Sequence, residues 1–304
     1  MIVRSLARRP NLAQSLASLA SVSARCLAPP AARRNYTVPS LANNDDLKEN
    51  GVPGLFSAAG FNTAYTGYMK WVIGQLNEVT AGQPEQNLST GDLTIKWARD
   101  PIMAHGFNCA SMAFNNHFFF SGINTDPNIE SAPSDALRAR INADFSSLQG
   151  LEDEFLATSE AMFGPGFIWL VQTQDRHALR ILPTYLAGSP LSGAHYRKQS
   201  HDLNTHNARS YEGLNTAGAF GANSEVARKE ATKDKKPLGG VDITPLLCVN
   251  TWEHVWLHDY GIGNKRKYLE QWWRRINWNK VEQLFTPDSS QRSQQVSQNN
   301  FLAR

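Results

Sequence analysis

Residues 249–254 read Val-Asn-Thr-Trp-Glu-His, and they lie in the stretch of this chain that decides its fold. The longer segment from Pro245 to Leu284 reads PLLCVNTWEHVWLHDYGIGNKRKYLEQWWRRINWNKVEQL. Its apolar start is typical of a strand, and the residues that follow are typical of helices. The pattern therefore predicts a strand that runs into a helix, with Asn250 and His254 at the junction.

This segment resembles the C-terminal signature of the iron/manganese superoxide dismutases, in which a strand leads into D-x-W-E-H-A-x-Y and a later helix into N-W. In that family the Asp and the His are two of four protein ligands of the metal. Here His254 keeps the His position, whereas Asn250 stands where the family has Asp. A second stretch, 164–170, is similar to the family's G-x-G-W-x-W-L, with Phe167 in place of the first Trp. The resemblance implies the dismutase fold, and the changed ligand argues against dismutase chemistry.

The rest of the chain fits one fold class. Apolar residues at helical spacing predict helices over 55–80, 98–120, 136–145 and 151–163. Strands are predicted over 166–174, 179–186 and 245–252. On the second helix an inward-facing seam is predicted, formed by Met103, Phe107, Ala110, Phe114 and His117. The fold class is therefore α+β: an N-terminal helical hairpin followed by an α/β domain with a three-stranded antiparallel sheet, as in the dismutases.

The first 36 residues differ in composition from the rest. They contain six arginines and no acidic residue, and the first acid is Asp45. This composition is typical of a mitochondrial transit peptide, and Arg34-Asn35-Tyr36 resembles a matrix-protease site. A disordered basic tail is the alternative. Without these arginines, 24 basic residues face 27 acidic ones and the formal net charge changes from +3 to −3, so net charge gives no argument for nucleic-acid binding.

Four segments are expected along the chain. They are a transit peptide at 1–36, a helical hairpin domain at 37–125, an α+β domain at 126–285 and a disordered polar tail at 286–304. The α+β domain carries a polar insertion at 192–240, which is too poor in large apolar residues to fold alone. No apolar run approaches the roughly 18 residues of a membrane span. The three isolated cysteines indicate no disulfide framework.

The dismutase resemblance implies four metal-ligand positions, which fall at Thr63, His117, Asn250 and His254. The first falls at Ala64 instead if the gap is placed differently, but neither residue is the family's His. Further family positions are changed too: Gly67 and Trp71 on the first helix, Ser121 after the second, Gly188 in the outer sphere and Leu257 in the proton relay. Two imidazoles and an uncharged amide bind a divalent ion much more weakly than the full set. We therefore expect no catalytic residue and no cofactor, with His117 and His254 as buried remnants; residual iron or manganese is the alternative.

A basic cluster follows the motif and comprises Lys265, Arg266, Lys267, Arg274 and Arg275, with Trp272, Trp273 and Trp278 between and beyond them. One interpretation is a solvated face beside packed tryptophans. The other is a contact with RNA phosphates or with a partner protein.

A matrix-targeted chain with a dismantled metal site resembles the dismutase-like structural proteins of the fungal mitochondrial ribosome small subunit. That resemblance implies a non-catalytic assembly module in the mitochondrial matrix, without membrane attachment. Its partners would be mitochondrial ribosomal proteins, among them a related dismutase-like subunit as a heterodimer, and ribosomal RNA. The retained Glu253, which crosses the dimer interface in dismutases, is consistent with a kept pairing surface. The alternative is an active or degenerate matrix superoxide dismutase.

Overall fold

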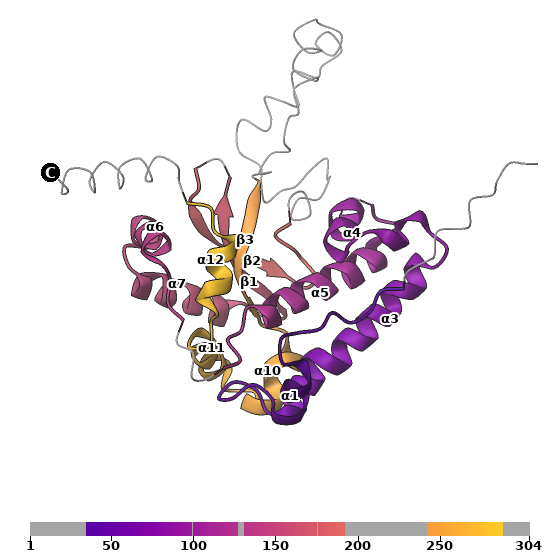
Figure 1. Ribbon diagram of the computed structural model, residues 1–304, viewed down its shortest axis with the longest axis horizontal. Coiled ribbons are helices and arrows are strands. Elements are labelled where there is room, and N and C mark those ends of the chain that lie inside the picture. The colour runs from indigo at the N-terminus through magenta and orange to yellow at the C-terminus, as the bar shows by residue number, and fades with distance from the viewer. Residues whose placement is uncertain (1–34, 99, 127–130, 175, 192–241, 288–304) are drawn as a thin grey trace, which may run out of the picture. The chain divides into compact units, whose positions relative to one another are not determined.

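The computed structural model of the chain describes residues 35–98, 100–126, 131–174, 176–191 and 242–287 (Figure 1). Contacts divide the chain into Met1–Asn35 and Tyr36–Arg304, and the second unit is the one described below. The expected transit peptide and the insertion at 192–240 therefore lie outside the described residues, apart from Asn35 and Tyr36. Most of the expected tail at 286–304 also lies outside them.

The N-terminal half is helical, as predicted, but it is more finely divided. Its elements are α1 (Asn44–Asn50), α2 (Ala58–Phe61), the π-helix η1 (Asn62–Gly67), α3 (Tyr68–Thr80), the 3₁₀ turn η2 (Pro84–Asn87), α4 (Thr90–Trp97) and α5 (Ala104–Ser121). The helix predicted over 55–80 corresponds to α2, η1 and α3. The helix predicted over 98–120 begins later, at Ala104, because a turn at Pro101 separates it from α4.

Helix α4 was not predicted, although the sequence carries a signal for its start. Ser89 caps the helix: its Oγ accepts a hydrogen bond from the N–H of Asp92 and donates one to the Asp92 carboxylate. This Ser-x-x-Asp arrangement is a capping pattern that satisfies backbone donors at a helix start. Between α3 and α4 the chain therefore forms a 3₁₀ turn, and α4 begins at Thr90.

The C-terminal half consists of a sheet with helices before and after it. Two helices, α6 (Asp135–Phe145) and α7 (Leu148–Ala161), lead into strands β1 (Gly166–Thr173) and β2 (Leu179–Tyr185). After the insertion come β3 (Ile243–Asn250), α10 (Glu253–Tyr260), α11 (Lys265–Trp273) and α12 (Trp278–Leu284). The strand order is β2-β1-β3, and β1 pairs antiparallel with both neighbours. This confirms the predicted three-stranded antiparallel sheet.

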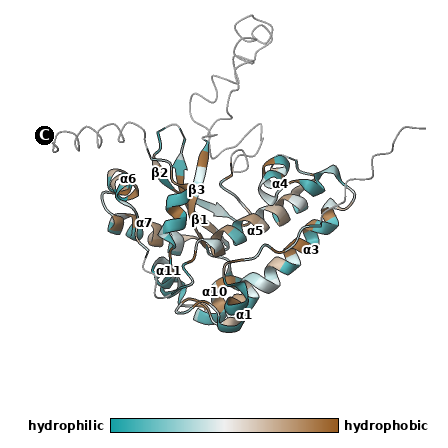
Figure 2. Cartoon of the chain, viewed as in Figure 1, coloured by the Kyte–Doolittle hydropathy of each residue, from teal (hydrophilic) through white to brown (hydrophobic). Residues whose placement is uncertain are grey.

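One apolar core joins the helical half to the sheet. Helix α5 packs against α3 and α4 on one side and against β3 on another, so it is buried on most of its surface. The predicted seam on this helix is therefore wrong in part: Phe114 and His117 are half-buried, whereas Asn115 and Asn116 are fully buried. Figure 2 shows apolar residues at intervals along α3 and on β3, as helices and strands that cover a core require. The predicted boundary between 125 and 126 stays a prediction.

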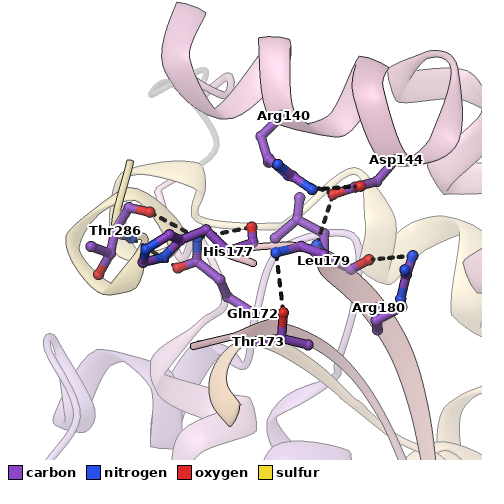
Figure 3. Close-up of polar contacts among 9 residues, drawn as sticks. Arg140, Asp144, Gln172, Thr173, His177, Leu179, Arg180 and Thr286 are labelled. Atoms are coloured by element: carbon purple, nitrogen blue, oxygen red, sulfur yellow. Dashed lines mark hydrogen bonds and ion pairs between the residues drawn. The ribbon is translucent and has the colours of Figure 1, made fainter. Parts of the chain in front are cut away.

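Polar contacts fix the end of the sheet where β1 turns into β2 (Figure 3). On α6, the Asp144 carboxylate accepts two hydrogen bonds from the guanidinium of Arg140 and one from the N–H of Leu179. On β1, the Gln172 amide pairs with the backbone of Thr286, donating at 2.8 Å and accepting at 3.0 Å. Helix α6 and the residues after α12 are thus both fastened to the same end of the sheet.

Candidate functional site

The end of β3 holds a chain of buried amides. The Asn250 Oδ1 accepts a hydrogen bond from the N–H of Trp252 at 2.9 Å, and its Nδ2 donates to the Asn116 Oδ1 at 3.0 Å. The Asn116 Nδ2 in turn donates to the carbonyl of Ala64 at 3.1 Å. Both asparagine side chains are fully buried. This amide chain (Asn250, Asn116 and the Ala64 carbonyl) joins β3, α5 and η1.

The amide chain leaves Asn250 unsuited to be a metal ligand. Its oxygen already accepts a backbone hydrogen bond, and its nitrogen is a donor that points at α5. The backbone carbonyl of Asn250 is also engaged, because it accepts a hydrogen bond from the Tyr268 hydroxyl at 2.8 Å. A cation at this point would have to break these bonds and would find no negative charge in return.

His117, the predicted second ligand position, faces the N-terminal residues. Its Nδ1 lies 2.9 Å from the Tyr65 hydroxyl, and that hydroxyl donates to the Pro39 carbonyl at 2.7 Å. Because a hydroxyl carries one hydrogen, this arrangement assigns the proton to the Nδ1 of His117 and leaves its Nε2 as an acceptor. Burial, and secondarily the positive charge of Lys280, lowers the pKa of His117. The ring lines a cavity of about 550 Å³ together with Tyr36 and Lys280.

His254, the predicted fourth ligand position, has different surroundings. Its ring stacks on that of Tyr68, with centroids 4.3 Å apart. Its Nε2 is buried without a hydrogen-bond partner in the part of the chain that the structure describes. Burial lowers the pKa of His254 to about 4, so the imidazole is neutral at pH 7. It is held by aromatic packing rather than by the hydrogen bonds that orient a metal-binding histidine.

The first ligand position offers no donor. Thr63 is exposed, and its hydroxyl donates to the Ala59 carbonyl at 3.0 Å, within its own helix. Ala64 is the residue that lies buried against α5. The sequence left Thr63 and Ala64 open as the first ligand position. Of the two, Ala64 lies at the remnant centre, by which we mean the site formed by Ala64, Asn116 and Asn250. The wider turn of the π-helix η1 changes which side chains face inward, and counting at 3.6 residues per turn does not reveal this.

These residues do not fit a dismutase metal. Across 35–98, 100–126, 131–174, 176–191 and 242–287, no three His, Cys, Asp or Glu side chains are grouped closely enough to hold an ion. His117 and His254 keep their residue type, but each is committed to a different aromatic neighbour. Asn250 is engaged in protein hydrogen bonds instead, and its partner on α5 is Asn116 rather than His117.

A larger cavity, of about 820 Å³, lies beside His254's stacking partner and was not predicted from the sequence. It is lined mainly by apolar residues of α3, α5 and β2, including Tyr68, Trp71, Met112 and Leu182, and by Trp252. Trp71 is 60% exposed. The Cys109 thiol in this wall lies 3.8 Å from the His105 Nε2, but burial raises the pKa of Cys109. A protonated thiol is a poor nucleophile, so the pair carries no catalytic signature.

The predicted basic cluster is partly neutralised within the protein. The Lys265 ammonium donates to the Met162 carbonyl at 2.8 Å. Arg266 pairs with Glu270 at 2.8 Å and with Glu160 at 3.3 Å. Arg275 is half-buried, whereas Lys267 and Arg274 are exposed. The intervening Trp272 and Trp273 are buried, as the interpretation of a solvated face beside packed tryptophans requires.

Comparison with known families places the C-terminal half in one of them. The family described as "Iron/manganese superoxide dismutases, C-terminal domain" matches residues 133–203 and 204–284. The matched region contains the whole sheet and helices α10 to α12, together with Asn250 and His254.

Individual relatives are of two kinds. Small ribosomal subunit protein mS42 of Schizosaccharomyces pombe is 30% identical over 198 residues, which cover 64% of this chain and 72% of the relative. Small ribosomal subunit protein mS43 of the same yeast is 26% identical over 257 residues, 83% of this chain and 84% of the relative. The iron superoxide dismutase of Legionella pneumophila is 26% identical over 206 residues, 68% of this chain and 78% of the enzyme.

Proposed function

Because this chain belongs to the iron/manganese superoxide dismutase family, yet lacks that family's ligand set, we propose that it is a structural subunit of the mitochondrial ribosome. It is a component of the small ribosomal subunit, and the dismutase fold serves there as an assembly module. The observation that carries the proposal is the amide chain, which occupies with hydrogen bonds the place where a dismutase needs a charged ligand. The similarity to mS42 and mS43 supports the same function.

The second candidate is a mitochondrial superoxide dismutase, favoured by the fold and by the two retained histidines. We expect the chain purified without its first 35 residues, so that Tyr36 is kept, to contain far less than one iron or manganese per chain and to show no superoxide turnover above buffer. The physical reason lies in the three ligand positions besides His254. They hold His117, Asn250, whose amide is already hydrogen-bonded, and Ala64, which has no donor atom in its side chain. Metal analysis and a superoxide assay after incubation with excess Fe²⁺ or Mn²⁺ measure this. Stoichiometric metal with fast turnover would contradict the proposal.

We propose that the chain pairs with a related dismutase-like subunit through the surface around α10. Glu253 is exposed at the start of that helix. Two large apolar side chains are also exposed, Phe163 at 95% and Ile262 at 88%. Their loops are neighbours, because Lys265 reaches from the start of α11 to the Met162 carbonyl. Apolar side chains exposed to this degree support an interface with another protein.

We further propose that RNA phosphates contact the exposed part of the basic cluster, Lys267 and Arg274. Reversing both charges, Lys267→Glu with Arg274→Glu, is expected to weaken association with the small subunit and to lower the log–log salt slope by about one unit per residue. Both side chains are exposed, so the fold should tolerate the change. Co-sedimentation with the small subunit across a salt series measures the effect.

The matched control reverses two exposed charges on other helices, Lys70→Glu with Arg138→Glu. It makes the same change in net charge and should leave the salt slope as it is. If both double variants behave like the natural chain, this placement of the phosphate contact is wrong. If the natural chain itself never sediments with the small subunit, the ribosomal function is wrong.

The proposed location is the mitochondrial matrix, where the ribosomal partners would be found. The acid-free, arginine-rich first 36 residues support it. Within the described ranges, no helix has the length and apolar character needed to span a bilayer.

A further inference from the structure

Tyr36 helps to hold the N-terminal edge of the folded unit. Its N–H donates to the Asn77 Oδ1 at 2.7 Å, and its carbonyl accepts from the Asn77 Nδ2 at 2.9 Å. The amide of Asn77 therefore grips both polar groups of the Tyr36 backbone. The Tyr36 hydroxyl shares its one hydrogen between the carbonyls of Leu88 at 2.7 Å and of Glu85 at 3.1 Å. This anchor (Tyr36 with Asn77) binds α3 and η2 together.

The anchor continues into the remnant metal centre. Three residues further on, the Pro39 carbonyl accepts the hydrogen bond of Tyr65, whose hydroxyl also contacts His117. Tyr36 and Pro39 line the same cavity as His117. Tyr36, Thr37 and Pro39 thus form part of the wall beside His117, and the chain cannot lose Tyr36 without loosening that wall.

We infer that processing hydrolyses the Asn35–Tyr36 peptide bond, so that the mature chain begins with Tyr36. One water adds across the amide: Asn35 leaves with a carboxylate, and Tyr36 gains an α-ammonium group. The inference rests on the proposed mitochondrial function, and it selects one bond where the sequence gives only a region. Tyr36 is the first residue of the folded unit. Arg34 would stand two residues before the cut.

The new terminus is accommodated by the structure. An α-amino group has a pKa of about 7.7–8.0 and is largely charged at neutral pH. It would keep the bond to the Asn77 Oδ1, and a charged donor makes that bond stronger. Asn77 lies in the last turn of α3, where the helix dipole favours a positive charge. A cut one residue later would remove all the hydrogen bonds of Tyr36 and expose the carbonyls of Glu85 and Leu88.

The experiment is N-terminal sequencing and intact-mass measurement of the endogenous protein from purified mitochondria. We expect a single N-terminus at Tyr36. A protease-protected protein that begins at Thr37 or later, or that retains Asn35, would overturn this inference and leave the ribosomal function standing. An intact protein found only outside mitochondria would overturn both.

A second measurement tests the anchor in the full chain after import. Tyr36→Phe removes the hydroxyl and keeps the ring, so the cut should stay at the same bond while the melting temperature of the imported protein falls by about 2–4 °C. The matched control is Tyr185→Phe, at an exposed tyrosine, and should leave the melting temperature unchanged. An unchanged melting temperature in Tyr36→Phe would remove the structural argument for the bond.

Discussion

Replacing Asn250 with aspartate, the residue of the active family members, is expected to destabilise this protein by about 2–4 kcal/mol at pH 7 rather than to restore a metal site. The natural Nδ2 donates to the Asn116 Oδ1 at 3.0 Å in a fully buried position. In the variant, a carboxylate oxygen would face the Asn116 Oδ1, and neither atom could donate a hydrogen bond. The carboxylate charge would also be buried without a cationic partner. The missing imidazole at Ala64 would still prevent tight metal binding.

The pH dependence of Asn250→Asp follows from the same geometry. Burial raises the pKa of an aspartic acid above its unfolded value of about 3.9. The protonated acid can donate to Asn116, so the variant is least destabilised at acidic pH, and the loss grows as the pH rises through the folded pKa. Urea unfolding at pH 5 and pH 8 measures the difference.

The control for this variant is Asn279→Asp, at an exposed asparagine of α12, which should unfold like the natural chain. If Asn250→Asp matches the natural stability at both pH values, the amide chain does not hold these elements together. If the variant binds one equivalent of iron or manganese, the remnant centre is more complete than its donors indicate.

The second large effect is expected from replacing His254, which should change how the stability of the fold depends on acidic pH. The folded pKa of about 4 lies below the usual 6.5, so the neutral ring favours the folded state fully above pH 6.5. This contribution is lost as the pH falls from 6.5 toward 4, to a limit of about 3 kcal/mol. His254→Phe keeps a ring on Tyr68 and removes the titrating nitrogen. We therefore expect its stability to fall less than that of the natural chain between pH 7 and pH 4.

Chemical unfolding at several pH values isolates this contribution, because carboxylates elsewhere titrate equally in both proteins. His258→Phe is the matched control, since His258 is an exposed residue of the same helix. It should keep the acid sensitivity of the natural chain. An identical pH profile for His254→Phe and the natural chain would show that the ring of His254 is solvated in solution.

The sequence was sufficient for the fold because its strongest signals come from elements that bury large side chains. The run around Trp169 predicts a strand, and the residues around Glu253 predict a strand-to-helix junction; both were confirmed. Helix α1 and helix α4 were missed, because each is short and buries few apolar residues. Short helices depend on caps and tertiary contacts, which hydrophobic periodicity does not register.

The sequence predicted which residue types occupy the remnant centre, but it did not predict which side chains contact each other there. The sequence indicated the loss at Asn250, yet it gave Asn116 no role, because the neighbouring His117 matched the ligand position. A fully buried Asn beside apolar residues on α5 is the signal that was available, since a buried amide needs a partner. The choice between Thr63 and Ala64 could not be made, because it depends on the π-helical turn η1.

The amide chain also changes what the cell must supply. A dismutase subunit obtains part of its internal cross-linking from an ion that has to be delivered after synthesis, so its maturation depends on metal homeostasis. Here the equivalent cross-link is encoded entirely in the polypeptide, through Asn250, Asn116 and the Ala64 carbonyl. On the proposed function, we expect the folding of this chain, and so its supply for assembly, to be independent of iron or manganese scarcity.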